Sequence, residues 1–321
     1  SRLIQLLRKI EDSPVRPKSL EGVYPVKAQD TFGRKILTSM GLDWNAGRLD
    51  TSTHPFCVGL NPNDVRITTR HAEKYFTSAL FGMIHEGGHA LYEQGLDATN
   101  YGLPVCDSTS LGMHESQSRL WENQIGRSRP FWEHWFPQLQ GFFPGQLDHL
   151  TLDDFVLAIN RVSPSFIRVE ADEVTYGLHI ILRYEIEKKL MAEEINVTDL
   201  PEVWNSKMEE YLGIRPSSEA EGVLQDTHWS QGLIGYFPTY LLGNLYGAQI
   251  MATASQEIPD LENQVSSGKL LELREWLQFN VHTPGNALSA SDLILRITGE
   301  DLSANYFLDY LDEKYSGLYQ L

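Results

Sequence analysis

Residues 70–94, RHAEKYFTSALFGMIHEGGHALYEQ, decide both the fold and the chemistry of this chain. Apolar residues recur there at three- and four-residue intervals, as they do on one face of a helix: Ala72, Phe76, Ala79, Leu80, Met83, Ile84 and Leu91. His85 and His89 are four residues apart, so a helix places both imidazoles on one face. The stretch therefore predicts a helix whose two histidines bind one divalent, zinc-like ion.

The residues between the two histidines carry further predictions. Glu86 follows the first ligand directly and can take a proton from a water in the open position of the ion, so it is the candidate general base. Gly87 and Gly88 each cost a helix about 1 kcal/mol relative to alanine. This cost indicates that another part of the protein approaches the helix backbone closely at these positions.

A catalytic metal site normally has three protein ligands, so a third must come from elsewhere. Glu115 is the candidate, and His114 is its rival. Residues 100–104, with Gly and Pro, break the first helix, and residues 107–110 offer N-caps for a second one. The distance along the chain from His89 suits a loop followed by the first turns of an antiparallel helix.

The rest of the chain is predicted to be mainly helical. Helical periodicity recurs around residues 2–10, 70–94, 109–124, 151–161, 170–194, 199–212, 238–254, 268–280, 289–298 and 302–319. The exception is a β-hairpin, predicted from two segments rich in Thr, Val and Ile, 51–60 and 65–69, on either side of the turn at 61–64. Its open edge could pair with an extended peptide, or the hairpin could simply pack on the helices.

Composition limits the classes of protein to which the chain can belong. The 321 residues, 41% of them hydrophobic, can fill a large core, and no linker divides them, so residues 1–321 are predicted to form one domain. The 43 acidic and 26 basic residues give a net charge of −17, which argues against nucleic acid as a partner. Cys57 and Cys106 lack the spacing of a thiolate metal site and the density of a disulfide scaffold, so we expect reduced core residues.

The hydropathy of two segments, residues 1–12 and 227–256, does not indicate a membrane protein. Residues 1–12 are amphipathic and lack the apolar run of a signal peptide, which makes the cytoplasm the default location. Residues 227–256 contain no Asp, Glu, Lys or Arg and are numerous enough to span a bilayer. Pro238, several amides and four glycines interrupt them, however, so we expect a buried helix that begins near Pro238 and no membrane association.

Taken together, the motifs resemble the carboxypeptidase Taq family of metal-dependent carboxypeptidases. The matching stretches appear in the order of the family: His54-Pro-Phe56, Asp64-Val-Arg-Ile-Thr68, His85-Glu-Gly-Gly-His89, His114-Glu-Ser-Gln117, Ile167-Arg-Val-Glu-Ala-Asp172 and Gly222-Val-Leu-Gln-Asp-Thr-His-Trp229. Six ordered motifs are far more specific than the pentapeptide alone.

The resemblance implies a helical fold with a long central groove, removal of single residues from peptide C-termini, and a homodimer. It implies His85, His89 and Glu115 as ligands of one ion, Zn²⁺ or Co²⁺, and Glu86 as the base. Family members usually carry a long helical region ahead of the matched residues, and this sequence begins inside it. We therefore expect either a fragment or a short form, with a wider groove.

An exopeptidase must recognise the terminal carboxylate of its substrate, and a guanidinium does this through two parallel hydrogen bonds. Arg168 is the first candidate because it lies in a family motif, and Arg66 and Arg70 are alternatives. Each of them could instead form a structural ion pair. His54, in the first of the matched stretches, is a further candidate for substrate binding.

The oxyanion of the tetrahedral intermediate also needs a hydrogen-bond donor. His228 and Tyr236 are the candidates, although either could be a buried structural residue. Gln225 and Asp226, in the same motif as His228, are candidates for orienting these side chains and for binding substrate. A metal-dependent endopeptidase or oligopeptidase would use the same ligands and base, and a non-catalytic peptide-binding protein could keep the same fold.

Overall fold

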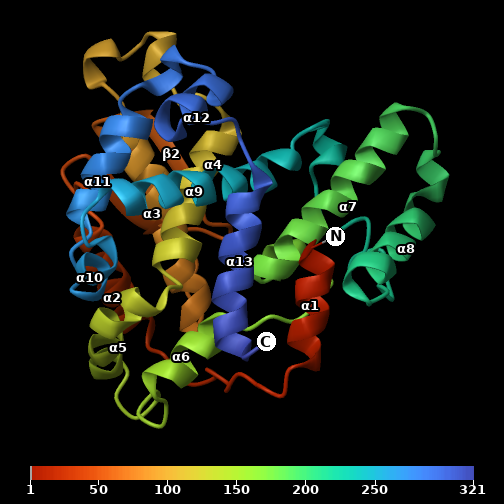
Figure 1. The fold of residues 1–321 in the computed structure, drawn as a ribbon, viewed down its shortest axis with the longest axis horizontal. Helices are drawn as coiled ribbons and strands as arrows, with labels where there is room; N and C mark the ends of the chain where they lie inside the picture. The colour runs from red at the N-terminus through yellow and green to blue at the C-terminus, as the bar shows by residue number, and fades with distance from the viewer. Residues whose placement is uncertain (1) are drawn as a thin grey trace. The chain divides into compact units, whose positions relative to one another are not determined.

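The structure is a computed structural model that describes residues 2–321, and its mainly helical fold confirms the predicted fold class (Figure 1). The chain forms two compact units. Unit 1 combines the chain up to Arg16 with Asn160–Leu242 and Phe307–Leu321, and unit 2 combines Pro17–Ile159 with Gly243–Tyr306. A single catalytic domain stays a prediction.

Unit 2 holds the predicted metal-binding helix. Its helices are α2 (Val26–Ser39), α3 (Phe76–Gly95), α4 (Leu111–Arg119), α5 (Arg129–Phe142), α6 (Leu152–Ile159), most of α9 (Pro238–Glu257), α10 (Leu261–Ser266), α11 (Leu271–Leu277) and α12 (Ala290–Thr298). Two π-helical segments, Leu120–Ile125 and Gln278–His282, continue α4 and α11. The predicted helix over 70–94 begins six residues late, at Phe76, because the backbone at Tyr75 is not helical (φ −137°, ψ 85°).

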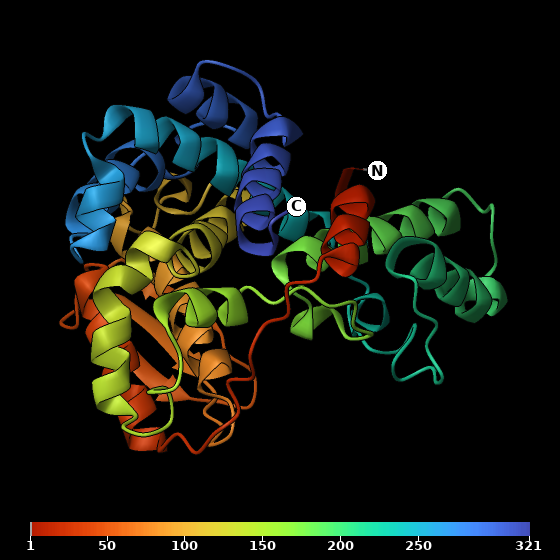
Figure 2. The ribbon, with the colours of Figure 1, turned by 60° about the horizontal axis from the view of Figure 1, so that its bottom comes forward.

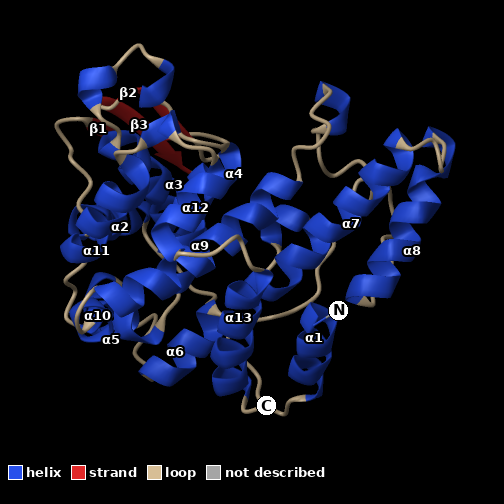
Figure 3. Ribbon diagram, turned by 45° about the horizontal axis from the view of Figure 1, so that its top comes forward, coloured by secondary structure: helices blue, strands red, loops and turns tan. Residues whose placement is uncertain are grey.

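The sheet of unit 2 has three strands in the order β1-β3-β2, and it lies beside α3 (Figure 3). Strands β2 (Cys57–Asn61) and β3 (Asp64–Thr69) form the predicted antiparallel hairpin. The prediction of one continuous strand over 51–60 was wrong. Residues 47–51 form a separate strand, β1 (Gly47–Thr51), which runs parallel to β3. Pro55, which has no N–H to donate, lies in the irregular connection between β1 and β2.

The close approach predicted at the two glycines of α3 is confirmed. A Cβ at Gly88 would lie 2.6 Å from the carbonyl oxygen of Gln117 and 2.7 Å from Cα of Ser118, so the backbone of α4 rests directly on α3. A Cβ at Gly87 would lie 2.4 Å from Cδ2 of Leu37 on α2. The two glycines lower the helix propensity of α3, but they allow close packing that brings α4 to the histidine face of α3.

This packing gives a testable difference between two glycines of one helix. We expect Gly88→Ala to lower the free energy of unfolding by about 1–3 kcal/mol, because the new methyl group collides with backbone and not with a movable side chain. Gly82→Ala is the matched control: its Cβ would meet only Oγ1 of Thr69, at 3.9 Å, so the variant should gain about 0.5–1 kcal/mol. Urea unfolding measures both, and equal effects would contradict the packing argument.

Unit 1 contains α1 (Arg2–Asp12), α7 (Glu173–Met191), α8 (Leu200–Leu212), most of α13 (Ala304–Tyr319) and the first residues of α9. Helices α7 and α8 pack side by side (Figure 1), and α1 lies against α7 (Figure 2). The Asp172 side chain begins α7 by accepting hydrogen bonds from two backbone N–H groups of its first turn. Tyr176, Ile180 and Phe237 form a buried cluster in this unit.

Two further predictions concern the whole described chain. The helix expected near Pro238 begins at that residue, and none of the helices over 2–321 combines the length and apolarity that a bilayer span requires. Both cysteines are free thiols. Cys106 is buried, as expected, whereas Cys57 is partly exposed at the start of β2.

Candidate metal centre

His85 and His89 of α3 and Glu115 of α4 converge in unit 2. Oε2 of Glu115 lies 3.7 Å from Nε2 of His85 and 3.3 Å from Nε2 of His89. One potential ligand atom from each of the three residues lies within 4.8 Å of the others. The third ligand chosen from the sequence therefore lies where the two histidines point, and the group could hold one metal ion.

Local sequence explains how Glu115 reaches this position. Oγ of Ser110 accepts a hydrogen bond from the backbone N–H of Met113 at 3.1 Å, which begins α4 within the predicted capping segment. In α9, a Cβ at Gly243 would lie 2.4 Å from Cγ of Glu115, so only glycine leaves room for this side chain. The rival ligand His114 points elsewhere, because its Nε2 lies 2.7 Å from Oε1 of Glu93.

Three charged side chains, Glu122, Arg119 and Arg127, support the three residues. Nδ1 of His85 lies 2.9 Å from Oε2 of Glu122, which stands on the π-helical segment Leu120–Ile125. Arg119 donates to Glu115 at 2.7 Å and to Glu122 at 3.3 Å, and Arg127 donates to Glu122 at 3.2 Å. A carboxylate behind a metal-bound histidine is a recurring arrangement that fixes its tautomer and orientation.

Sequence reasoning missed both Glu122 and Arg119. The sequence does contain a pattern that could have identified them. Glu115, Arg119 and Glu122 are spaced by four and then three residues, which places all three on one face of a helix.

The protonation states of His89 and Glu115 suit a metal ion. Burial lowers the pKa of His89 to about 3, so its ring is neutral at pH 7 and keeps a lone pair to donate. Burial would raise the pKa of Glu115, but the charges of Arg119 and His85 outweigh it and hold that pKa well below its usual range. Two imidazoles and one ionised carboxylate are a donor set that Zn²⁺ accepts in catalytic sites with an open position.

Glu86 is buried beside these residues, with 7% of its surface exposed. Burial, with smaller contributions from the carboxylates of Glu115 and Glu122 and opposition from His85, raises the pKa of Glu86 to about 7. A carboxylate with a pKa near neutrality can both accept and return a proton. A bound cation nearby would favour its ionised, proton-accepting form.

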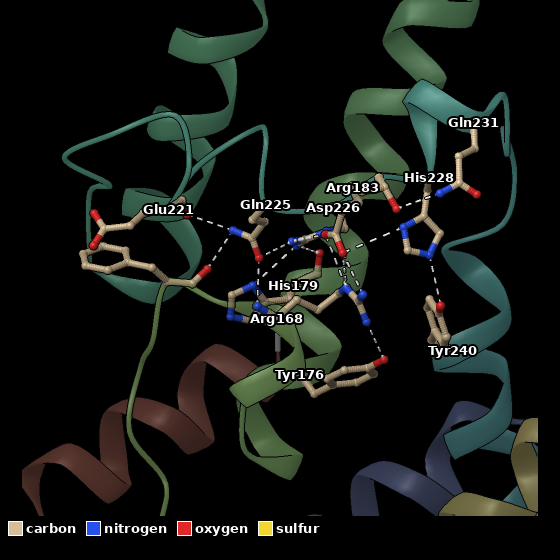
Figure 4. A network of polar contacts seen from close by, with 12 residues as sticks. Arg168, Tyr176, His179, Arg183, Glu221, Gln225, Asp226, His228, Gln231 and Tyr240 are labelled. Carbon is tan, nitrogen blue, oxygen red and sulfur yellow. Dashed lines mark hydrogen bonds and ion pairs between the residues drawn. The ribbon is translucent and has the colours of Figure 1, made fainter. Parts of the chain in front are cut away.

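In unit 1, four of the residues selected from the sequence form one polar network: Arg168, Gln225, Asp226 and His228 (Figure 4). Nε and Nη2 of Arg168 lie 3.1 and 2.7 Å from Oδ1 of Asp226. The backbone N–H of Arg168 donates to Oε1 of Gln225 at 2.8 Å. Nε2 of His228 lies 3.0 Å from the hydroxyl of Tyr240, and Nδ1 of His228 lies 3.8 Å from Asp226.

Arg183 of α7 completes this network, and sequence reasoning missed it. Its side chain is fully buried, donates to Asp226 at 2.7 Å and to Gln225 at 2.8 Å, and lies over the ring of Trp204. Burial lowers the pKa of Arg183 to about 10, against the opposing effect of Asp226, so it stays a cation at pH 7. Two guanidinium groups therefore share one carboxylate, which leaves a local excess of positive charge.

The other residues selected from the sequence make separate contacts. The ring of Tyr236 lies beside that of His228, with 5.4 Å between the centroids. Arg66 is exposed on β3 and forms an ion pair with Asp64 at 2.9 Å, which is the structural alternative expected for it. Arg70 and His54 are exposed near the sheet.

Comparisons with known proteins identify the family of this chain. The family model of the carboxypeptidase Taq (M32) metallopeptidases matches residues 1–315. The chain is 48% identical over 316 residues to thermostable carboxypeptidase 1 of Thermus thermophilus, covering 98% of this chain and 62% of the relative. It is 45% identical to carboxypeptidase 1 of Bacillus subtilis, covering 99% and 64%.

Solved structures give the same result for the fold. The crystal structure of the M32 carboxypeptidase from Deinococcus radiodurans R1 superimposes with a TM-score of 0.96 at 41% identity, covering 99% of this chain and 65% of that one. The chain thus spans a little under two thirds of the length of these three proteins.

Proposed function

Because this chain belongs to the carboxypeptidase Taq (M32) family of metallopeptidases, we propose that it is a metal-dependent carboxypeptidase that removes residues from the C-termini of peptides. The observation that carries the proposal is the convergence of His85, His89 and Glu115 beside the buried carboxyl group of Glu86. A homodimer and a cytoplasmic location, both expected from the sequence, belong to the same proposal.

We propose that His85, His89 and Glu115 hold one divalent ion, Zn²⁺ or Co²⁺. Such an ion, when bound, supplies Lewis acidity for a carbonyl group and lowers the pKa of a water molecule towards neutrality. Glu86 takes a proton from the attacking water and returns it to the leaving amine, so hydrolysis needs no covalent intermediate. Glu122 and Arg119 keep the ligand side chains oriented and Glu115 ionised.

In this proposal, Arg168 binds the terminal carboxylate of the substrate. The excess positive charge that it shares with Arg183 supports this role, because a buried charge without a partner is costly and attracts an anion. Asp226 already accepts from Nε and Nη2 of Arg168, so the substrate would use the Nη1 side, where the hydroxyl of Tyr176 lies 3.2 Å away. Gln225 and Asp226 hold the guanidinium in place.

The remaining roles are also proposals. His228, held by the hydroxyl of Tyr240, or its neighbour Tyr236 donates a hydrogen bond to the oxyanion of the tetrahedral intermediate. His54 and Arg66, both exposed in unit 2, are candidate contacts for the rest of the peptide.

A substitution behind the ligands tests the metal centre. We expect Glu122→Gln to weaken Zn²⁺ binding about 10- to 100-fold, because a neutral amide supports His85 less well and removes a carboxylate from Arg119 and Arg127. Competition with a chelating dye measures the affinity. Glu133→Gln, which removes an exposed carboxylate from an ion pair with Arg129, should leave it unchanged. Equal affinity of the two variants would contradict the supporting role of Glu122.

The test of the proposed activity is mass spectrometry of one peptide with a free or an amidated C-terminus, after incubation with the metal-loaded protein. We expect successive C-terminal losses from the free peptide only, because an amide lacks the carboxylate that Arg168 would bind. Internal cuts in both peptides would instead indicate an endopeptidase. Cleavage of neither would favour a non-catalytic peptide-binding protein.

A further inference from the structure

The two histidines of the candidate metal centre are held in different ways. Nδ1 of His85 has the carboxylate of Glu122 as its partner at 2.9 Å. Nδ1 of His89 is buried and has no hydrogen-bond partner among residues 2–321, the part that the structure describes. Metal-binding histidines usually have a hydrogen bond at the second nitrogen, which fixes the orientation of the ring. Some other contact must therefore orient His89.

That contact is a column of aromatic rings, formed by His89, His114, Tyr92 and His282. The rings of His89 and His114 are stacked, with 4.5 Å between centroids and 21° between planes. His114 stacks on Tyr92 at 5.3 Å and 22°, and Tyr92 stacks on His282 at 5.0 Å and 28°. Each ring thus lies nearly parallel to the next, from the metal ligand to the core of unit 2.

Hydrogen bonds hold the second ring of the column, His114, and its last ring, His282. Near the metal ligand, Nε2 of His114 lies 2.7 Å from the carboxylate of Glu93. At the far end, Nε2 of His282 lies 2.9 Å from Oε1 of Gln117, and both side chains are fully buried. A Cβ at Gly95 would lie 2.5 Å from Nδ1 of His282, so the glycine makes room for this ring.

We propose that the ring column positions His89, so that stacking replaces the missing hydrogen bond and keeps Nε2 of His89 directed at the metal. His114 and Tyr92 are then positioning residues for the metal ligand. The inference rests on the metal centre of the proposed function, but it is independent of which bond the enzyme cleaves. It can therefore be tested by metal binding without any measurement of peptide hydrolysis.

The test compares His114→Ala with His114→Phe. The first removes the ring, and the second keeps a ring in the column but removes the hydrogen bond to Glu93. We expect His114→Ala to weaken Zn²⁺ binding about tenfold or more, the effect typical of a lost supporting group. His114→Phe should bind Zn²⁺ as tightly as the wild type. Dissociation constants come from competition with a chelating dye, and thermal unfolding of the metal-free proteins shows that each variant folds.

A second pair of variants probes the column further from the metal. Tyr92→Leu removes a ring that stacks on His114 and His282, whereas Tyr92→Phe keeps it and removes the hydroxyl group. We expect weaker Zn²⁺ binding and an altered visible absorption spectrum of bound Co²⁺ for Tyr92→Leu alone. This pair also serves if His114→Ala does not fold.

Three results would overturn the inference. Unchanged affinity in His114→Ala and Tyr92→Leu would show that the rings do not position His89. Equal losses in His114→Ala and His114→Phe would assign the effect to the contact with Glu93 and not to stacking. Wild-type protein that binds no ion would refute the proposed metal centre itself, which separates failure of the proposed function from failure of this inference.

Discussion

The Glu86→Gln variant should hydrolyse a peptide with a free C-terminus about 10²- to 10⁴-fold more slowly than the wild type and should still bind Zn²⁺. Glutamine has nearly the same shape as glutamate but cannot accept a proton from water. Because Glu86 is not among the three converging ligand residues, metal binding should survive the change. Steady-state kinetics and the chelating-dye competition measure the two quantities.

Glu115→Gln is the matched comparison, because it also replaces a carboxylate with an amide, but at a proposed metal ligand. We expect it to lose both Zn²⁺ affinity and hydrolysis, whereas Glu86→Gln loses hydrolysis alone. A Glu86→Gln variant that retained full activity would place the general base elsewhere. Loss of the metal in that variant would instead make Glu86 a structural support of the ligands.

The Asp226→Asn variant should lose about 3–5 kcal/mol in free energy of unfolding. The carboxylate of Asp226 is shared by Arg168 and Arg183, and the side chain of Arg183 has 0% of its surface exposed. Removing the negative charge leaves two buried cations side by side. Urea unfolding at neutral pH measures the change. Asp64→Asn, at the exposed ion pair with Arg66, should change stability by less than about 0.5 kcal/mol.

The ion pairs of Asp226 with Arg168 and Arg183 also predict that the free energy of unfolding depends on pH. Burial would raise the pKa of Asp226, but Arg168 and Arg183 outweigh it and lower that pKa below its ordinary value. A group with a lowered pKa stabilises the folded state fully above its unfolded pKa, about 4 for aspartate, and less as the pH falls further. The stability difference between the wild type and Asp226→Asn should therefore narrow below about pH 4. A constant difference would contradict the ion-pair explanation.

Features set by local sequence could be predicted. The apolar periodicity around His85 and His89 predicted a helix. In a helix, residues four apart share a face, so the two side chains had to lie close together. The close approach at the glycine pair could also be predicted. Glycine lowers helix propensity, and Gly88 has no turn nearby that would need it, so a close tertiary contact was the remaining explanation. The position of Glu115 near the two histidines followed from chain reversal, since the break after α3 and the cap at Ser110 leave little freedom for α4.

Features that depend on distant packing could not be predicted. Helix α5 was missed because it contains Pro137, which normally marks a break. Strand β1 was missed because its partner, β3, is parallel, and a parallel partner leaves no turn between the strands. Arg183 lies in no motif, and only the folded network shows that it shares Asp226 with Arg168.

The π-helical segments of unit 2 impose a constraint on chain length as well as on residue type. Both have backbone hydrogen bonds that span five residues, at 2.8 Å from Gly126 to Trp121 and from Thr283 to Gln278. Each segment carries a side chain of the metal region, Glu122 in one and His282 in the other. Deleting a single residue would restore a regular helix and rotate the next part of the chain by about 100°. In evolution, such deletions should be rarer here than substitutions.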